Sequence, residues 1–97
     1  MRKLAFVASA LLAACTTAPA EPPVHGVTPG HKCNASGTDK FIGLPGTVAM
    51  GQAILRASNA AVLRVAEPNT MLTMDYREDR VTIWLDQAQK ITKIRCG

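Results

Sequence analysis

This sequence predicts an α+β domain in which one helix packs on a small mixed sheet and a long exposed loop joins two strands. Apolar residues recur with a helical period over residues 47–58, and apolar and polar residues alternate over residues 61–66 and 80–86. Between these two alternating segments, residues 67–79 show no regular period. A loop of about a dozen residues is uncommon in a compact domain and is usually functional.

The helix is predicted from the pattern between Thr47 and Ser58. Thr47, which follows Pro45-Gly46, is the predicted N-cap, and the helix is predicted to end at Ser58-Asn59. Gln52 and Arg56 fall on the face opposite the recurring apolar and small residues, which are Val48, Met50, Gly51, Ile54, Leu55 and Ser58. The pattern therefore indicates one amphipathic helix.

Three strands are predicted after the helix, at residues 61–66, 80–86 and 91–95. In the first, Leu63 and Val65 share one face and Val62 and Arg64 share the other. The second alternates more clearly. Its inward residues are Val81, Ile83 and Leu85, and its outward residues are Arg80, Thr82 and Trp84. The predicted order is helix, strand, long loop, strand, turn and strand.

The loop over residues 67–79 begins with a turn signal, Glu67-Pro68-Asn69, and continues with an extended, apolar segment over residues 70–76. Two interpretations remain open from periodicity alone. The loop is exposed and functional, or its apolar residues continue a strand into the core. Those apolar residues are Met71, Leu72 and Met74.

The first fourteen residues are expected to be a signal peptide. A basic start, Met1-Arg2-Lys3, precedes a short apolar run, and Leu12-Ala13-Ala14-Cys15 resembles the lipobox of a bacterial lipoprotein. The run is too short for a membrane span, which takes about 20 residues. Acylation of Cys15 would hold the chain in the cell envelope by lipid. Thr16 after this cysteine favours sorting to the outer membrane, by resemblance to known lipoproteins.

Residues 15–32 are expected to form a lipid-anchored, flexible tether, because they are rich in proline and glycine and have little to bury. The domain is expected to span residues 33–97. With Cys15 assigned to lipid, Cys33 and Cys96 remain as a natural disulfide pair in an oxidising compartment. Such a crosslink would stabilise the domain by roughly 4 kcal/mol in the chain-entropy model.

Several functional classes are disfavoured by composition. Removing Arg2 and Lys3 lowers the net charge of the chain from +4 to +2, and neither a basic run nor an aromatic platform for nucleic acid remains. His25 and His31 precede Cys33 and lack metal-ligand spacing, so no metal or cofactor is expected. An enzyme is not expected either, since no serine or cysteine lies near a histidine within the domain.

Residues 73–81, Thr-Met-Asp-Tyr-Arg-Glu-Asp-Arg-Val, resemble the reactive loop and following strand of the potato inhibitor type I proteins, the group that contains eglin. The predicted helix and strands fall in matching order over most of residues 41–97. Peptidase inhibitor family 78, the elastase-inhibitor type of fungi and bacteria, is a closer resemblance. It rests on Cys33-Asn34-Ala35, Phe41-Ile42-Gly43, the Thr-x-Asp-Tyr-Arg-x-Asp-Arg pattern over residues 73–80, and Ile94-Arg95-Cys96-Gly97.

This resemblance implies a potato inhibitor type I-like fold and a monomeric inhibitor of serine peptidases, with Met74-Asp75 as the scissile bond. It also implies that Arg80 holds the loop through Thr73 and Asp75. The expected peptidase contacts around the bond are Met71, Leu72, Thr73, Tyr76 and Arg77. One departure is Thr82, which stands where the potato inhibitors commonly carry a second supporting arginine. Arg77, Arg95 or the disulfide would have to substitute for it.

Met74 is long, unbranched and apolar, which suits the pockets of subtilisin-, chymotrypsin- or elastase-like enzymes but not the buried carboxylate of trypsin. Two competing interpretations are structural: Met74 fills the core, or Arg80 forms an ordinary surface salt bridge with Asp79 or Glu78. A third keeps the fold without inhibition, as an envelope lipoprotein that binds another partner.

Overall fold

The computed structural model describes residues 24–97. The predicted signal peptide, the predicted lipidation site at Cys15 and the first part of the predicted tether lie outside these residues. The predicted α+β class is confirmed. The described elements are η1 (Ala35–Gly37), η2 (Asp39–Phe41), α1 (Val48–Ser58), β1 (Val62–Ala66), β2 (Arg80–Leu85) and β3 (Ile91–Cys96). Within residues 24–97, no helix is long and apolar enough to span a bilayer.

Helix α1 begins and ends where the sequence predicts. The Thr47 hydroxyl accepts a hydrogen bond from the Met50 amide at 3.1 Å, which satisfies one of the free amides of the first turn. Asn59 ends the helix in the left-handed conformation with φ 62°. The two short 3-10 helices that precede α1 were not predicted, because three-residue elements carry too little periodic signal.

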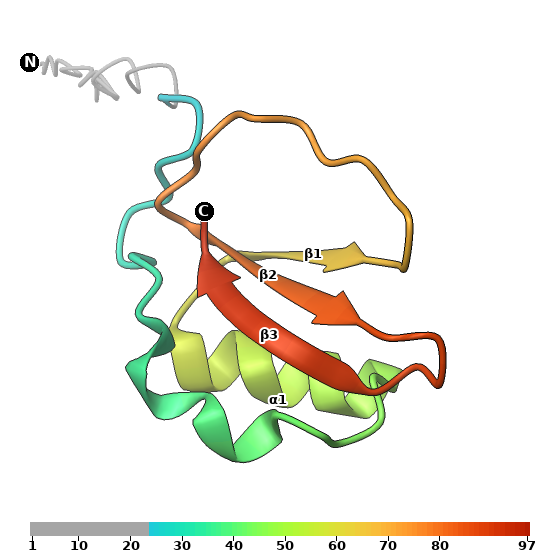
Figure 1. Ribbon diagram of the computed structural model, residues 1–97. Helices are drawn as coiled ribbons and strands as arrows, with labels where there is room; N and C mark the ends of the chain where they lie inside the picture. Colours follow the sequence, from blue (N-terminus) through green and yellow to red (C-terminus); the bar gives the residue numbers. More distant parts are fainter. Residues whose placement is uncertain (1–23) are drawn as a thin grey trace, which may run out of the picture.

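The sheet has the order β1-β2-β3, with β1 parallel to β2 and β2 antiparallel to β3 (Figure 1). Parallel neighbours need a crossover of about a dozen residues or more. Here the crossover is the irregular loop of residues 67–79, which arches over the sheet on the side opposite α1 (Figure 1). The topology therefore requires this segment to cross the sheet from the end of β1 to the start of β2.

The core lies between α1 and one face of the sheet. The residues predicted to point inward from β2 are all buried there, and they join a cluster with Ile54 of α1; the cluster is Phe41, Ile54, Ala60, Val81, Ile83, Leu85 and Ile91. Gly51 lets the helix approach β1, because a Cβ at this position would lie 2.9 Å from Leu63 Cδ2. The alternation in the sequence of β2 therefore predicted correctly which of its side chains face the core.

The predicted pairing of Cys33 with Cys96 is confirmed, with a Cα–Cα distance of 5.7 Å. The bond joins the segment before η1 to the last residue of β3, across 63 residues of sequence. In the chain-entropy model a closed loop of this length stabilises the fold by roughly 4 kcal/mol.

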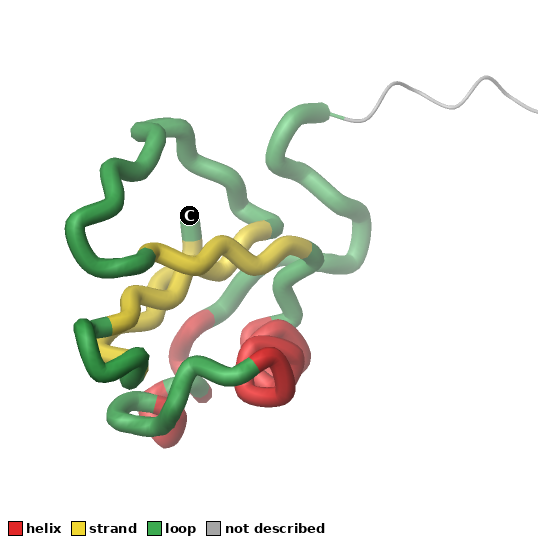
Figure 2. The backbone as a smooth tube through the Cα atoms, turned by 90° about the vertical axis from the view of Figure 1, so that its right-hand side faces the viewer, coloured by secondary structure: helices red, strands yellow, loops and turns green. Residues whose placement is uncertain are grey.

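Two of the β2 residues predicted to face outward, Arg80 and Thr82, are nevertheless buried. Arg80 and Thr82 do lie on the face away from α1, yet they are only 8% and 1% exposed. The reason is that the loop of residues 67–79 and the last residue, Gly97, lie over this face (Figure 2). Periodicity assigns a side chain to a face but does not tell what covers that face.

The end of the predicted tether also differs from expectation, because residues 24–32 lie against the domain. The Asp79 amide donates to the Gly26 carbonyl at 3.1 Å, and the Asn59 side chain donates to the Gly30 carbonyl at 3.1 Å. The composition of this segment suggested a chain with nothing to bury. It is attached instead through polar groups, and hydrophobic patterning does not detect such attachment.

Candidate functional site

The apolar side chains of the loop point into solvent. Met71 is 95% exposed, Met74 is 98% exposed and Tyr76 is 69% exposed, while Leu72 is half-buried. The alternative interpretation, in which these methionines extend a strand into the core, is therefore wrong. Large apolar side chains left this exposed on a small domain are typical of a surface that binds a partner.

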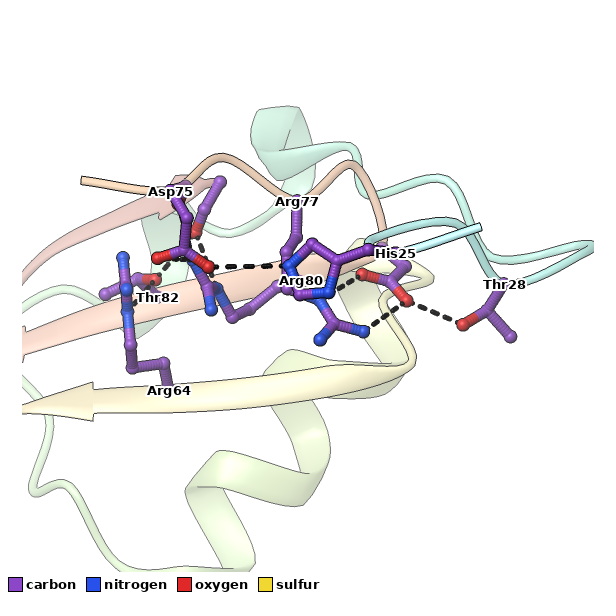
Figure 3. Close-up of polar contacts among 9 residues, drawn as sticks. His25, Thr28, Arg64, Asp75, Arg77, Arg80 and Thr82 are labelled. Atoms are coloured by element: carbon purple, nitrogen blue, oxygen red, sulfur yellow. Dashed lines mark hydrogen bonds and ion pairs between the residues drawn. The ribbon is translucent and has the colours of Figure 1, made fainter. Parts of the chain in front are cut away.

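Arg80 reaches up from the start of β2 beneath this loop (Figure 3). Its Nη2 donates to the Asp75 carbonyl at 2.9 Å and lies 3.7 Å from the Asp75 carboxylate. Its Nε donates to the Gly97 backbone oxygen at 3.1 Å. The guanidinium is thus held at two points of its planar fork, which fixes the position of the Asp75 backbone above it.

Thr73 is held by a different arginine from the one expected. Arg64 of β1, and not Arg80, donates from Nη1 to the Thr73 hydroxyl at 3.4 Å. That hydroxyl in turn donates to the Asp75 carboxylate. The two residues on either side of Met74 are therefore linked to each other and to the sheet.

Thr82 explains how Arg64 comes to lie there. In the parallel register Arg64 pairs with Thr82, whose hydroxyl accepts from Arg64 Nε at 3.1 Å and donates to the Gly97 backbone oxygen at 3.0 Å. A threonine on β2 thus leaves room for a guanidinium from β1. Sequence reasoning named Arg77, Arg95 or the disulfide as substitutes for a second arginine and missed Arg64. In the sequence, Arg64 falls on the face of β1 opposite Leu63 and Val65. Only the pairing of β1 with β2 shows that this face lies beneath Thr73.

Arg77 was expected to contact a peptidase, but its guanidinium turns back onto the buried carboxylate of Asp79. The two N–H···O distances are 2.9 Å from Nε and 3.0 Å from Nη2, a bidentate arrangement. The Asp79 side chain is fully buried, and the Thr28 hydroxyl also donates to it at 2.6 Å. The proposed surface pairing of Arg80 with Asp79 or Glu78 is wrong, since Asp79 binds Arg77 and Arg80 binds Asp75.

Both carboxylates of this site remain ionised in mild acid. The hydrogen bond from the Thr73 hydroxyl is the main cause that lowers the pKa of Asp75 to about 2. Desolvation opposes it, and a backbone hydrogen bond, the charge of Arg80 and the His25 contact lower the pKa further. Hydrogen bonds from Arg77 and Thr28 hold the pKa of Asp79 far below its usual value. Asp79 in return raises the pKa of Arg77. The ions around the loop therefore stabilise one another's charged forms.

Gly97 closes the site from below. Its amide donates to the Arg80 carbonyl at 2.9 Å, and its φ is 123°, a conformation that side chains rarely adopt. A Cβ at this position would also lie 3.0 Å from the Tyr76 ring. Glycine is thus required where the last residue passes beneath the loop.

The arrangement is that of a binding element. It displays an exposed segment above two ion pairs, each of which has one buried partner. Within residues 24–97, no three histidine, cysteine or acidic side chains lie together in a way that could hold a metal ion.

Two solved structures of peptidase inhibitors are similar to this chain. Among solved structures, an elastase inhibitor named AFUEI is 29% identical, with 61% of this chain and 81% of that chain covered at a TM-score of 0.49. The bitter gourd trypsin inhibitor is 20% identical, with 70% and 94% covered at a TM-score of 0.53, and shares the fold. A search of curated proteins found no match.

Residues 33–97 match the peptidase inhibitor I78 family, and the chain belongs to that family. The partner class that the family implies is a peptidase. The matched residues begin at Cys33, so the segment of residues 24–32 that touches the loop lies outside the family match.

The low pKa of Asp75 predicts how the loop responds to acid. A carboxyl whose pKa is depressed in the folded state stabilises that state above its unfolded pKa, near 3.8, and the contribution is lost as the pH falls through about 2. Titration of the Asp75 carboxyl carbon by NMR should therefore show a midpoint near 2. Thr73→Val should move the midpoint upward, while Thr92→Val, on the exposed face of β3, should not. A native midpoint near 3.8 would contradict the Thr73 contact.

Proposed function

We propose that this protein inhibits serine peptidases by presenting Met74-Asp75 as a substrate-like bond, and that it acts as a monomer. The observation that carries the proposal is the position of Met74. This side chain is 98% exposed, while Thr73 and Asp75 on either side of it are tied to Arg64 and Arg80. The Met74 side chain makes few contacts with its own domain, while the residues on either side of it are held by hydrogen bonds. Such a side chain can enter the pocket of another protein.

Preorganisation would supply the affinity. A serine peptidase binds its substrate as an extended strand, and a loop already held in shape loses little further conformational freedom on binding. Slow turnover would follow from the same restraint. After attack on the Met74 carbonyl, the amine of Asp75 must stay close enough to reform the peptide bond. Arg80, bonded to the Asp75 carbonyl at 2.9 Å, supports that role.

The specificity we infer follows from Met74. Its flexible apolar side chain suits the pockets of subtilisin-, chymotrypsin- and elastase-type enzymes, and it brings no charge to the carboxylate of trypsin. Leu72 and Tyr76 flank the bond and are available as additional contacts. Arg77 is less available, because its guanidinium is committed to Asp79.

The disulfide supports inhibition in a second way. Cys33 precedes the proposed scissile bond and Cys96 follows it, so cleavage would leave the two parts covalently joined. The cleaved form would remain one molecule. We further infer that the order of helix, parallel strands and crossover loop is that of the potato inhibitor type I fold.

Exchanging the residue before the proposed bond should change the target enzyme. The native full chain, purified in mild detergent, should inhibit subtilisin, chymotrypsin and elastase but not trypsin in a titration of residual activity. Met74→Arg should gain inhibition of trypsin, because the guanidinium can pair with the buried carboxylate of that enzyme.

Met71→Arg is the matched control, since Met71 is equally exposed in the same loop but lies three residues from the proposed bond. It should leave trypsin uninhibited. If the native chain inhibits none of the four enzymes, the alternative of a non-inhibitory envelope protein is favoured. If both variants inhibit trypsin equally, the scissile bond is not at Met74.

Removing the arginine beneath the loop should turn the inhibitor into a substrate. Arg80→Ala deletes the donors to Asp75 and Gly97, and loss of one charged hydrogen bond is worth about tenfold in an equilibrium. Mass spectrometry during incubation with subtilisin should show the variant cleaved at 74–75 faster than the native chain. Arg56→Ala, at an exposed position on α1, is the control. An equally persistent loop in both variants would remove Arg80 from the mechanism.

We also propose that the chain is a bacterial envelope lipoprotein anchored through Cys15, with residues 1–14 removed as a signal peptide. The lipobox-like Leu-Ala-Ala-Cys sequence supports this proposal. Cys15→Ser should abolish labelling by radioactive palmitate and release the protein from the membrane fraction of a bacterial host. Cys33→Ser, which changes another cysteine, should retain the label. Labelling of the Cys15→Ser chain would contradict lipidation at this site.

A further inference from the structure

The segment that precedes the family match runs beside the half of the loop that follows the proposed scissile bond. Residues 25–28 lie next to residues 75–79, and we call residues 25–28 the N-terminal clasp. The Gly26 carbonyl accepts from the Asp79 amide at 3.1 Å, and the Thr28 hydroxyl donates to the Asp79 carboxylate at 2.6 Å. His25 Nε2 lies 3.6 Å from the Asp75 carboxylate (Figure 3).

Gly26 brings the clasp into direct contact with the loop. It is buried, and its φ is 82°. A Cβ at this position would lie 3.2 Å from the Cα and Cγ of Arg77 and 3.3 Å from its Cβ. Only a glycine combines this conformation with so close an approach to Arg77. The backbone of the clasp therefore packs directly on the loop.

Asp79 is the junction between the clasp, the loop and the sheet. Its fully buried carboxylate accepts two hydrogen bonds from Arg77 and one from Thr28. Its carbonyl accepts from the amides of Ala61 and Val62, at the start of β1. Burial of a carboxylate costs free energy unless its hydrogen bonds are made. Loss of one donor should therefore change the hydrogen bonds that the carboxylate makes with the others. The Thr28 hydroxyl thus helps to set where Arg77 lies.

We propose that the N-terminal clasp positions the segment after the scissile bond, so that the amine released from Asp75 stays in place to reform that bond. In the forward step the peptidase serine attacks the Met74 carbonyl, the C–N bond breaks, and the Asp75 nitrogen leaves as an amine with a proton from the catalytic histidine. In the reverse step this amine returns the proton, attacks the acyl carbon and expels the serine. Thr28 and Gly26 are positioning residues for the reverse step.

The two sides of the bond are held by different parts of the chain. Before the bond, Thr73 is tied to Arg64 of β1. After it, Arg80 holds Asp75, and the hydrogen bonds among Arg77, Asp79 and Thr28 hold Arg77. The leaving amine is the nitrogen of Asp75, which lies after the bond. The clasp therefore contacts the part of the loop that carries this amine. This inference rests on the proposed function.

The test measures resynthesis directly. Full chains are incubated with a catalytic amount of subtilisin until the ratio of intact to cleaved inhibitor is constant, and the ratio is read by mass spectrometry. Thr28→Val keeps the shape of the side chain but removes the donor to Asp79. It should lower the ratio about tenfold, the worth of one hydrogen bond to a charged group. Thr28→Ser restores the hydroxyl and should restore the native ratio.

Thr92→Val is the matched control, because it makes the same substitution on an exposed residue of β3 away from the loop. Gly26→Ala provides a second variant, which should lower the ratio by displacing Arg77. Urea unfolding of each intact chain identifies any general loss of stability. A variant that merely weakens the fold would be less stable in urea but would keep the native ratio.

An unchanged ratio in both Thr28→Val and Gly26→Ala would overturn the proposal. So would a Thr28→Ser variant that behaves like Thr28→Val. Failure of the proposed function is seen separately, because the native chain itself would then neither inhibit subtilisin nor be cleaved at 74–75.

Discussion

The parallel pairing of β1 with β2 is the constraint on which the rest of this structure depends. Two adjacent parallel strands cannot be joined by a tight turn, so the chain must return across the sheet between Ala66 and Arg80. In many folds a helix makes this return and covers the sheet. Here α1 already covers the other face, and the return is an irregular loop. Its exposure follows from topology, and its rigidity must come from side chains beneath it.

Those side chains are charged and largely buried, and their burial explains how a loop with so few apolar contacts is held. Arg80 and Asp79 are 8% and 0% exposed, and each carries several hydrogen bonds. Buried charges are unfavourable when left unpaired, which ties each partner to one position. A hydrophobic support would stabilise the loop without specifying where its backbone lies. The ion pairs also fix the position of the loop backbone, and a substrate-like loop requires a fixed backbone.

The same arrangement connects distant parts of the chain to one short segment. Residues 73–79 are contacted by Arg64 from β1, by Arg80 from β2 and by Thr28 from before the domain, while Gly97 fills the space below. The disulfide then joins the beginning of the matched domain to the last residue of β3. A loop held from both ends and from beneath is the physical basis of the inhibition we propose.

Local pattern in the sequence was enough to determine the helix, the strands and the core face of β2, because periodicity and capping act over a few residues. The Cys33–Cys96 pairing followed from counting cysteines. Tertiary structure alone decided that Met74 is exposed, since an apolar extended segment reads equally well as a core strand. It also decided that Arg64 lies under Thr73 and that Thr28 binds Asp79. These contacts depend on strand register and on chain segments that are far apart in sequence. The spacing of residues along the chain does not predict such contacts.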